Sequence, residues 1–345
     1  MFNVVNIIPT GIGANIGGFA GDANPVNSVL ETFCDLVITH PNAVNAANLY
    51  AATSKTLYVE GFALDNFLSG NLGLKKSYNK IGVIIDKKAE PQITHIINAL
   101  NACISVYGAD ISGFLLTDEE IGARVVKDSG NLFNGVVTNK EAMFKAAEKL
   151  ISEGANTLAV FTVLENPYED AENIYLAGKG VDPIGRLEAL ISHMLVEETG
   201  VPCAHAPVFL DDYERTVSDP RVAAEEIGFT YIPCVIRGLQ FAPRFIQPES
   251  IFSGCITLSD INALVCPFSC VGANWMQTVL QKNIPVIAVK ENTTFINDIP
   301  EKFGLEEKII IAENYLEAIG ILLSLKAGLS YKSLRRPLSG IKRVF

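Results

Sequence analysis

Short apolar runs alternate with helical patterns along almost the whole of this chain. Each run has the length of a buried β-strand, and most are followed by apolar residues that recur with helical spacing. Strands that alternate with helices are typical of parallel sheets. The predicted strands are 2–9, 34–39, 56–62, 81–86, 111–116, 157–163, 203–209, 229–236, 262–266, 284–289 and 307–312. The predicted helices are 25–34, 42–53, 91–107, 139–153, 183–199, 220–227, 272–282 and 314–327.

The number of predicted strands exceeds what one open sheet commonly holds. We therefore expect an α/β fold of two lobes with mostly parallel sheets. Each lobe should have a three-layer, Rossmann-like architecture, with the ligand cleft between the lobes. The expected domains are 1–150, an α/β lobe with a glycine-rich loop, and 151–345, a second α/β lobe. Their boundary should fall within 120–180, because 164–182 reads as a long polar loop.

Two segments of the chain resemble one another weakly. Residues 36–48 and 262–274 both read as strand, polar residue, proline, small polar residues and helix, with His40-Pro41 opposite Cys266-Pro267. A duplicated lobe would place two strand ends face to face across a cleft between domains. Coincidence explains the few identities equally well.

The composition argues against some classes of binding partner. The chain has 345 residues, of which 49% are hydrophobic and 19% charged, and a formal charge of −11. This acidity argues against a nucleic-acid partner, and no apolar run reaches the roughly 18 residues of a membrane span. Seven scattered cysteines suit reduced thiols, and the first residues show no secretory signal. These features predict a cytoplasmic protein without a membrane partner.

A glycine-rich loop follows the first predicted strand. It contains Gly11, Gly13, Gly17, Gly18 and Gly21. Such loops let backbone N–H groups approach an anion, so we expect them to bind a carboxylate or phosphate. The spacing departs from the G-x-G-x-x-G pattern, which leaves NAD or NADP as an alternative ligand. A loop that merely packs tightly is the remaining interpretation.

A histidine and two asparagines follow the second predicted strand. His40, Asn42 and Asn45 lie where a strand ends and a helix begins, which is the edge that binds ligands in open α/β sheets. An imidazole there can act as acid or base near neutral pH, and the asparagines can bind an anion. A hydrogen-bonded structural histidine is the alternative.

Cys270 precedes the predicted helix 272–282. A thiol before a helix N-terminus has a lowered pKa, which would make Cys270 a nucleophile or an acid–base group. The alternative is a buried cysteine that acts as a small hydrophobic residue. The spacing of Cys266 and Cys270 is weak evidence for a metal site, and we predict none.

Three further residues are candidates for the site. His205 ends a predicted strand and is a second acid–base candidate, with a satisfied core histidine as the alternative. Arg186 and Arg237 could bind the anion. Around Arg186, the helix that begins at Asp182-Pro183 also carries Glu188 and His193, where structural ion pairs are the simpler interpretation.

Several strings resemble a full-length protein family of unknown function found mainly in cyanobacteria and plant plastids. They are Ile8-Pro9-Thr10-Gly11-Ile12-Gly13-Ala14, Gly17-Gly18-x-Ala20-Gly21-Asp22-Ala23, Thr39-His40-Pro41-Asn42-x-x-Asn45-Ala46-Ala47 and Asp182-Pro183-Ile184-Gly185-Arg186-x-Glu188-Ala189-x-Ile191-Ser192-His193. The resemblance implies a cytoplasmic or stromal setting and no particular activity. More loosely, the two lobes resemble two-domain racemases, in which one thiol from each lobe faces the substrate. This chain has His40 where the first thiol would lie.

Together these features predict an enzyme for a small anionic substrate. We expect proton transfer beside a carboxylate, as in an isomerase, racemase or lyase, because such chemistry needs acids and bases but no cofactor. His40 and Cys270 would be the acid–base pair. The alternatives are an NAD- or NADP-dependent oxidoreductase and a non-catalytic binding protein. The apolar helix 314–327 further predicts a homodimer, because a helix that is apolar all round must be covered.

Overall fold

The computed structural model describes residues 1–19, 21–45, 51–127, 133–210, 230–338 and 340–341. Its largest sheet has six parallel strands in the order β15-β14-β13-β1-β2-β3. They are β1 (Asn3–Asn6), β2 (Leu36–Thr39), β3 (Thr56–Tyr58), β13 (Ala263–Pro267), β14 (Val286–Val289) and β15 (Ile310–Ala312). Every residue of β1, β2, β3, β13 and β14 is buried, which suits a sheet covered on both faces.

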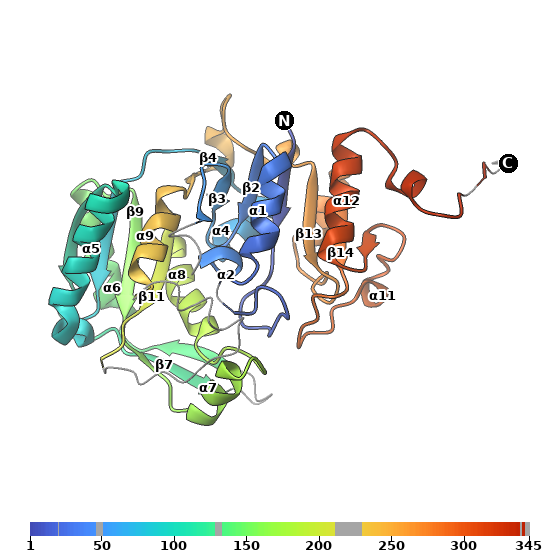
Figure 1. Cartoon of the computed structure of the whole chain (residues 1–345). Helices are drawn as coiled ribbons and strands as arrows, with labels where there is room; N and C mark the ends of the chain where they lie inside the picture. Colours follow the sequence, from blue (N-terminus) through green and yellow to red (C-terminus); the bar gives the residue numbers. More distant parts are fainter. Residues whose placement is uncertain (20, 46–50, 128–132, 211–229, 339, 342–345) are drawn as a thin grey trace.

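The second sheet lies beside the first and is also parallel (Figure 1). Its order is β11-β9-β5-β6, with β5 (Ile81–Ile85), β6 (Ile111–Leu116), β9 (Thr157–Thr162) and β11 (Cys203–Pro207). The remaining strands form two small sheets. One joins β7 (Ala123–Lys127), β8 (Phe133–Val137) and β10 (Leu164–Glu165), and the other joins β4 (Gly73–Lys75) and β12 (Arg244–Ile246).

Helices cover both faces of each large sheet. On the six-stranded sheet, α1 (Asn24–Phe33) and α12 (Tyr315–Lys326) cover one face, and α4 (Gly61–Leu68) and α10 (Met276–Gln281) cover the other. On the four-stranded sheet, α5 (Ile93–Tyr107) and α9 (Ile232–Gln240) lie opposite α6 (Lys140–Ser152) and α8 (Gly185–Thr199). The expected α/β fold of two lobes with mostly parallel sheets is confirmed. One apolar core reaches from α4 and α10 to α6 and α8, so the lobes share it.

The sheets divide the chain differently from the predicted boundary at 120–180. The six-stranded sheet takes strands from both ends of the chain, whereas the four-stranded sheet uses the middle, where β5 pairs with β9. The two similar segments, 36–48 and 262–274, supply β2 and β13, which pair with opposite sides of β1. They therefore lie in one sheet and do not face each other across the cleft.

One predicted strand, 229–236, is wrong. Residues 232–240 form α9, with Pro233 in the first turn, where its missing N–H costs no hydrogen bond. A short apolar run does not distinguish a buried strand from a buried helix. The predicted helix 220–227 lies outside the described residues, as does part of 42–53, of which Pro41–Val44 form α2. The structure also adds α4, α7 (Glu169–Leu176) and α11 (Pro300–Phe303), which the periodicity does not indicate.

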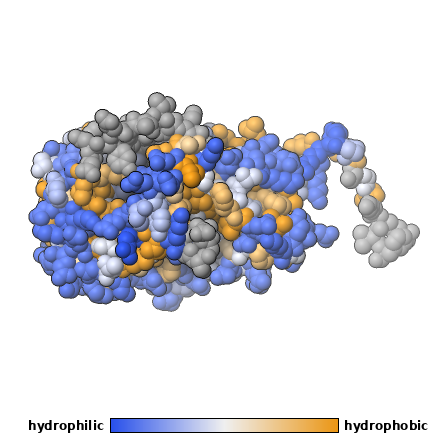
Figure 2. Space-filling view, turned by 90° about the horizontal axis from the view of Figure 1, so that it is seen from below, coloured by the Kyte–Doolittle hydropathy of each residue, from blue (hydrophilic) through white to orange (hydrophobic). Residues whose placement is uncertain are grey.

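The segment after α12 leaves the body of the molecule in both views (Figures 1 and 2). It contains one 3-10 turn, Tyr331–Leu334, and Arg335 in it forms an ion pair with Glu317 of α12. Its apolar residues Leu329, Leu334 and Leu338 are exposed. No helix of the described residues is long and apolar enough to cross a membrane.

Candidate functional site

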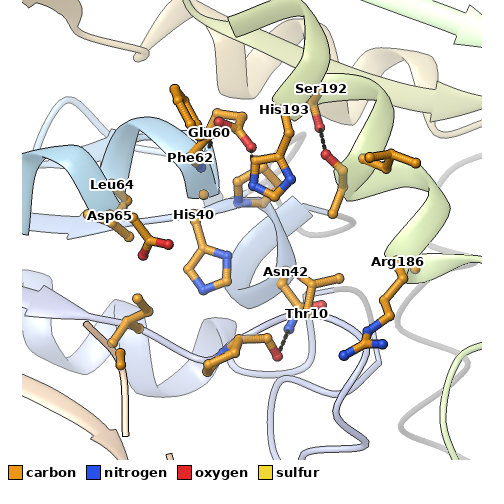
Figure 3. A pocket seen from close by; sticks show the side chains of 18 of the residues that line it. Thr10, His40, Asn42, Glu60, Phe62, Leu64, Asp65, Arg186, Ser192 and His193 are labelled. Atoms are coloured by element: carbon orange, nitrogen blue, oxygen red, sulfur yellow. Dashed lines mark hydrogen bonds and ion pairs between the residues drawn. The ribbon is translucent and has the colours of Figure 1, made fainter. Parts of the chain in front are cut away.

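A cavity of about 800 Å³ opens where the strands of the six-stranded sheet end and faces helix α8. Four segments supply most of its wall: the turn after β1, the His40 turn after β2, the start of α4 after β3, and the segment after β13. Helix α8 closes the opposite side. Figure 3 shows that His40, Glu60 and His193 are directed toward the same space. This is the edge at which open α/β sheets bind ligands.

His40 presents a neutral imidazole to this cavity. Pro41 begins α2, so His40 is the extended residue that precedes the helix. Its Nε2 accepts the Ile8 N–H at 3.0 Å, which places the ring proton on Nδ1. Burial lowers the pKa of His40 to about 4. The ring is 5% exposed and its Nδ1 has no protein partner among the described residues. His40 is therefore a hydrogen-bond donor toward the cavity, not a proton acceptor at neutral pH.

Glu60 and His193 form an acid–base pair that joins a buried carboxyl group to a partly exposed imidazole. Glu60 precedes α4, and its Oε2 accepts the Phe62 and Ala63 N–H groups at 2.8 and 3.3 Å. Its Oε1 lies 3.0 Å from His193 Nε2 of α8. Gly61 permits this approach, because a Cβ there would lie 3.1 Å from His193 Nε2.

Burial changes the titration of both partners. It raises the pKa of Glu60 to about 8 and lowers the pKa of His193. Near neutral pH the pair therefore shares one proton and carries no net charge. A group of this pKa can both give and take a proton under physiological conditions.

Arg186 is the cation of the cavity. Its Nη1 donates to the Phe133 carbonyl at 3.4 Å, and it forms no ion pair with any carboxylate in the described part of the chain. Its side chain passes directly over Gly11, where a Cβ would lie 2.3 Å from Arg186 Cγ. Gly11 has a φ of +69°, so the residue is glycine for two reasons. An unpaired guanidinium in a cavity suits a ligand carboxylate or phosphate.

His205 lines the cavity, and its side chain is held in a chain of hydrogen bonds. Its Nδ1 lies 3.0 Å from Glu188 Oε1, and its Nε2 lies 2.7 Å from Thr162 Oγ1. Both ring nitrogens are thus engaged, and the side chain is only 2% exposed. His205 therefore orients Glu188, which also lines the cavity. The structure favours this role over the predicted one of acid or base.

The predicted thiolate at Cys270 does not form. Helix α10 begins only at Met276, so Cys270 is too far from its N-terminus for the dipole to act. Burial raises the pKa of Cys270 to about 11, and Sγ lies 3.9 Å from Thr294 Oγ1. Cys266 is also buried with a raised pKa. Both thiols line the cavity, where they supply apolar wall.

The glycine loop does not line the cavity with free amides. The N–H groups of Asn15, Ile16 and Gly17 are bonded to the Thr293 carbonyl, Asn292 and Asp22. Gly11, Gly13, Gly17 and Gly18 lie outside the cavity wall, and a Cβ at each would overlap a neighbour at 2.0–2.7 Å. The prediction of anion binding by these four glycines is therefore corrected to close packing. The bonded amides of Asn15, Ile16 and Gly17 are not available to a dinucleotide pyrophosphate.

Three other predicted anion-binding residues have structural partners. Asn42 Nδ2 donates to the carbonyls of Ile8, Pro9 and Gly17, and so fastens the loop. Asn45 Oδ1 accepts the Tyr58 hydroxyl at 2.8 Å. Both line the cavity, but their bonded groups are engaged. Arg237 lies elsewhere, on α9, against the rings of Tyr107 and Phe241.

The sequence interpretation missed Glu60 and Asp65. The strand predicted at 56–62 ends at Tyr58, so Glu60 belongs to the carboxyl edge and not to the strand interior. Correct placement of that strand end was the one signal that could have revealed it. Asp65, whose Oδ1 accepts the Trp275 indole N–H at 3.0 Å, had no signal in the sequence. Among the described residues, no group of three or more His, Cys, Asp or Glu side chains is arranged to hold a metal ion.

Fold and cavity define a two-lobed α/β protein with a cavity at the strand ends of its six-stranded sheet. Comparison with known proteins gives its family. Residues 3–335 match the model described as "Protein of unknown function (DUF3326)", and the chain belongs to this family, which confirms the expected membership of a full-length family of unknown function. A protein of Synechococcus sp., named "Uncharacterized lipoprotein", is 35% identical over 330 residues, which cover 94% of this chain and 91% of that protein.

Proposed function

We propose that this protein is an enzyme that transfers a proton at the carbon beside the carboxylate of a small molecule. The observation that carries the proposal is the Glu60–His193 pair, which shares one proton at 3.0 Å in the wall of a cavity. Such a volume lies within the range of about 300–1,000 Å³ that is common for small-molecule sites. Isomerases, racemases and lyases all use this type of step.

Each polar group has a role in this proposal. Arg186 binds the substrate carboxylate, which reduces the charge that resists removal of the neighbouring proton. The imidazole of His193, held by ionised Glu60, takes that proton from carbon, and the electron pair moves into the carboxylate as an enolate. His40 Nδ1–H donates to the oxygen that gains charge. The proton then returns to carbon from the same pair. Cys270 takes no part.

Deuterium exchange tests this proposal. The protein would be incubated in D₂O with a panel of small α-amino, 2-hydroxy and 2-keto carboxylates, and exchange at the α-carbon followed by NMR. We expect exchange with at least one member and a loss of about 100-fold or more in Glu60→Gln, a common effect of removing an acid–base group. Glu148→Gln, at an exposed position on α6 outside the cavity, is the matched control.

The pH dependence gives a second readout. Removal of a carbon-bound proton requires ionised Glu60, so the exchange rate should rise as pH approaches about 8, the pKa of that carboxyl group. Exchange that persists in Glu60→Gln would contradict the proposal. Binding of panel members without any exchange would also contradict it and would favour a non-catalytic binding protein.

We propose a cytoplasmic or stromal location for the protein. The Synechococcus relative is named a lipoprotein, so attachment to a membrane through a lipid is the competing proposal. Fractionation of the native host decides between them. Recovery of the protein in the membrane pellet after a high-salt wash would contradict a cytoplasmic location.

A further inference from the structure

The cavity wall contains more carboxyl groups than we would expect in a site that binds only an anion. Four carboxyl groups line it, in Glu60, Asp65, Asp182 and Glu188. Against them stands a single arginine, and no lysine lines the wall. Glu60 is neutralised by the shared proton and Asp65 is bonded to Trp275. Among the described residues, neither Asp182 nor Glu188 forms an ion pair with a lysine or an arginine.

Asp182 and Glu188 are built into the wall, not merely exposed there. Asp182 precedes α8, and its Oδ1 accepts the Ile184 N–H at 2.9 Å. Glu188 is held by His205, which is held in turn by Thr162. Burial, and then the charge of Glu188, raises the pKa of Asp182 to about 7. Two fixed carboxylates that repel each other define a place for a cation.

Arg186 follows Asp182 in the sequence and precedes Glu188, and only Arg186 and Glu188 lie within α8. No ion pair joins Arg186 to either acid. The positive and negative groups are therefore held apart in one cavity. His40 gives an independent sign of a ligand in the same space, because this residue lines the cavity, is only 5% exposed, and has no protein acceptor for its Nδ1–H among the described residues.

We infer that the substrate is a zwitterion, a small amino acid whose ammonium group binds between Asp182 and Glu188 while its carboxylate binds Arg186. This inference rests on the proposed function and adds the substrate class. An ammonium group beside both acids would replace the missing cation, whereas a hydroxyl group would leave their repulsion in place. The carboxylate and the ammonium of an α-amino acid are close together. The groups that would receive them are also close in the chain, because Asp182 immediately precedes α8 and Arg186 and Glu188 lie in its first turns.

Matched ligands test the inference. The probes are L- and D-alanine, serine and aspartate, each compared with the 2-hydroxy acid of the same side chain, with binding followed by calorimetry and thermal shift. We expect at least one amino acid to bind about 10-fold or more tightly than its hydroxy partner, which corresponds to about 1.4 kcal/mol. Binding near pH 7 should release protons, seen as a heat that depends on the buffer, because a bound cation favours ionised Asp182.

Variants separate the two charged contacts. Asp182→Asn keeps an acceptor for the Ile184 N–H, and Glu188→Gln keeps a partner for His205, so at least one should fold. Either should reduce the preference for the amino acid and spare the hydroxy acid. Arg186→Gln should weaken both ligands. Glu198→Gln, exposed on the same helix, is the control.

The outcomes distinguish this inference from the proposed function. Equal or tighter binding of the hydroxy acids, no binding by any probe, or an unchanged preference in the folded variants would overturn the zwitterionic substrate. Exchange of a hydroxy acid that still depends on Glu60 would keep the proposed function and refute this inference. Selective binding of an amino acid without exchange would keep the zwitterionic ligand and refute the proposed proton transfer.

Discussion

Single residues decide how the cavity is charged, and Glu60 has the largest effect. Its carboxyl group is 3% exposed, so the folded protein keeps a proton that the unfolded chain releases. Between the ordinary pKa of 4.5 and the raised value of about 8, the folded state binds more protons than the unfolded state. Stability must therefore fall as pH rises through this window, at up to about 1.4 kcal/mol per pH unit.

Glu60→Gln should remove this dependence. The amide oxygen still accepts the Phe62 and Ala63 N–H groups, but the side chain no longer titrates. Relative to the wild type, the variant should gain stability steadily from pH 5 to pH 8, measured by urea unfolding. His193 titrates in both proteins, so the difference isolates Glu60. A flat difference, like that expected for the exposed Glu148→Gln, would show that Glu60 is already ionised at pH 5.

Gly11 illustrates a residue whose absent side chain matters. Gly11→Ala adds a Cβ at a φ of +69° and directs it into the Arg186 side chain at 2.3 Å. Gly108→Ala is a matched control, because its φ is +66° and nothing lies within 4 Å. Both variants should lose about 1–2 kcal/mol from the left-handed backbone. Only Gly11→Ala should also weaken binding of a carboxylate ligand by displacing Arg186, and equal binding by both variants would refute this coupling.

At the scale of elements, Asn42 is one of the side chains that hold the glycine loop in place, together with Asp22 and Asn292. Asn42 of α2 donates to carbonyls on both sides of the turn, in Ile8, Pro9 and Gly17. Asn42→Ala leaves these carbonyls unpaired and should cost about 1–3 kcal/mol in the free energy of unfolding. Asn71→Ala, at an exposed turn, should cost far less. Similar midpoints for the two variants in thermal unfolding would show that the loop is held by packing alone.

The elements also show what periodicity can and cannot predict. Buried parallel strands such as Ile81–Ile85 and Thr157–Thr162 are continuous apolar runs, and the sequence predicts them to within a residue. The run 229–236 is also largely apolar, but its residues 232–236 form the start of α9, because tertiary packing decides between strand and helix. The strand β3 ends four residues before its predicted end, and that error concealed Glu60.

The candidate site was predictable only in part, for a physical reason. Polar residues that follow strand ends, such as His40, can be found from the sequence, because the fold fixes where parallel strands point. The protonation state of each group depends on its burial and on partners that are distant in the sequence. The pKa of Cys270 is raised and not lowered, and the Glu60–His193 pair joins the residue before α4, which packs on the six-stranded sheet, to α8, which packs on the four-stranded sheet. Neither contact has a local signature in the sequence.

At the scale of the molecule, the C-terminal region leaves apolar surface uncovered. Helix α12 was expected to be buried all round, but Leu316 is 81% and Leu323 is 45% exposed, while Ile321 and Leu322 pack on the six-stranded sheet. The segment that follows projects from the body with further exposed leucines (Figure 2). Exposed apolar side chains grouped in one region are typical of a surface that binds another protein.

We therefore predict a homodimer in which α12 and the segment after it cover the same region of a second copy. Two-fold pairing is the most frequent way for a chain to cover such a surface. Light scattering at micromolar concentration should give about twice the chain mass of 37.3 kDa. Leu316→Lys combined with Leu323→Lys should shift the mass toward one chain without unfolding, because both positions are exposed. Val106→Lys, at a 77% exposed site on α5, should leave the dimer intact. A wild-type mass near 37 kDa would refute the dimer.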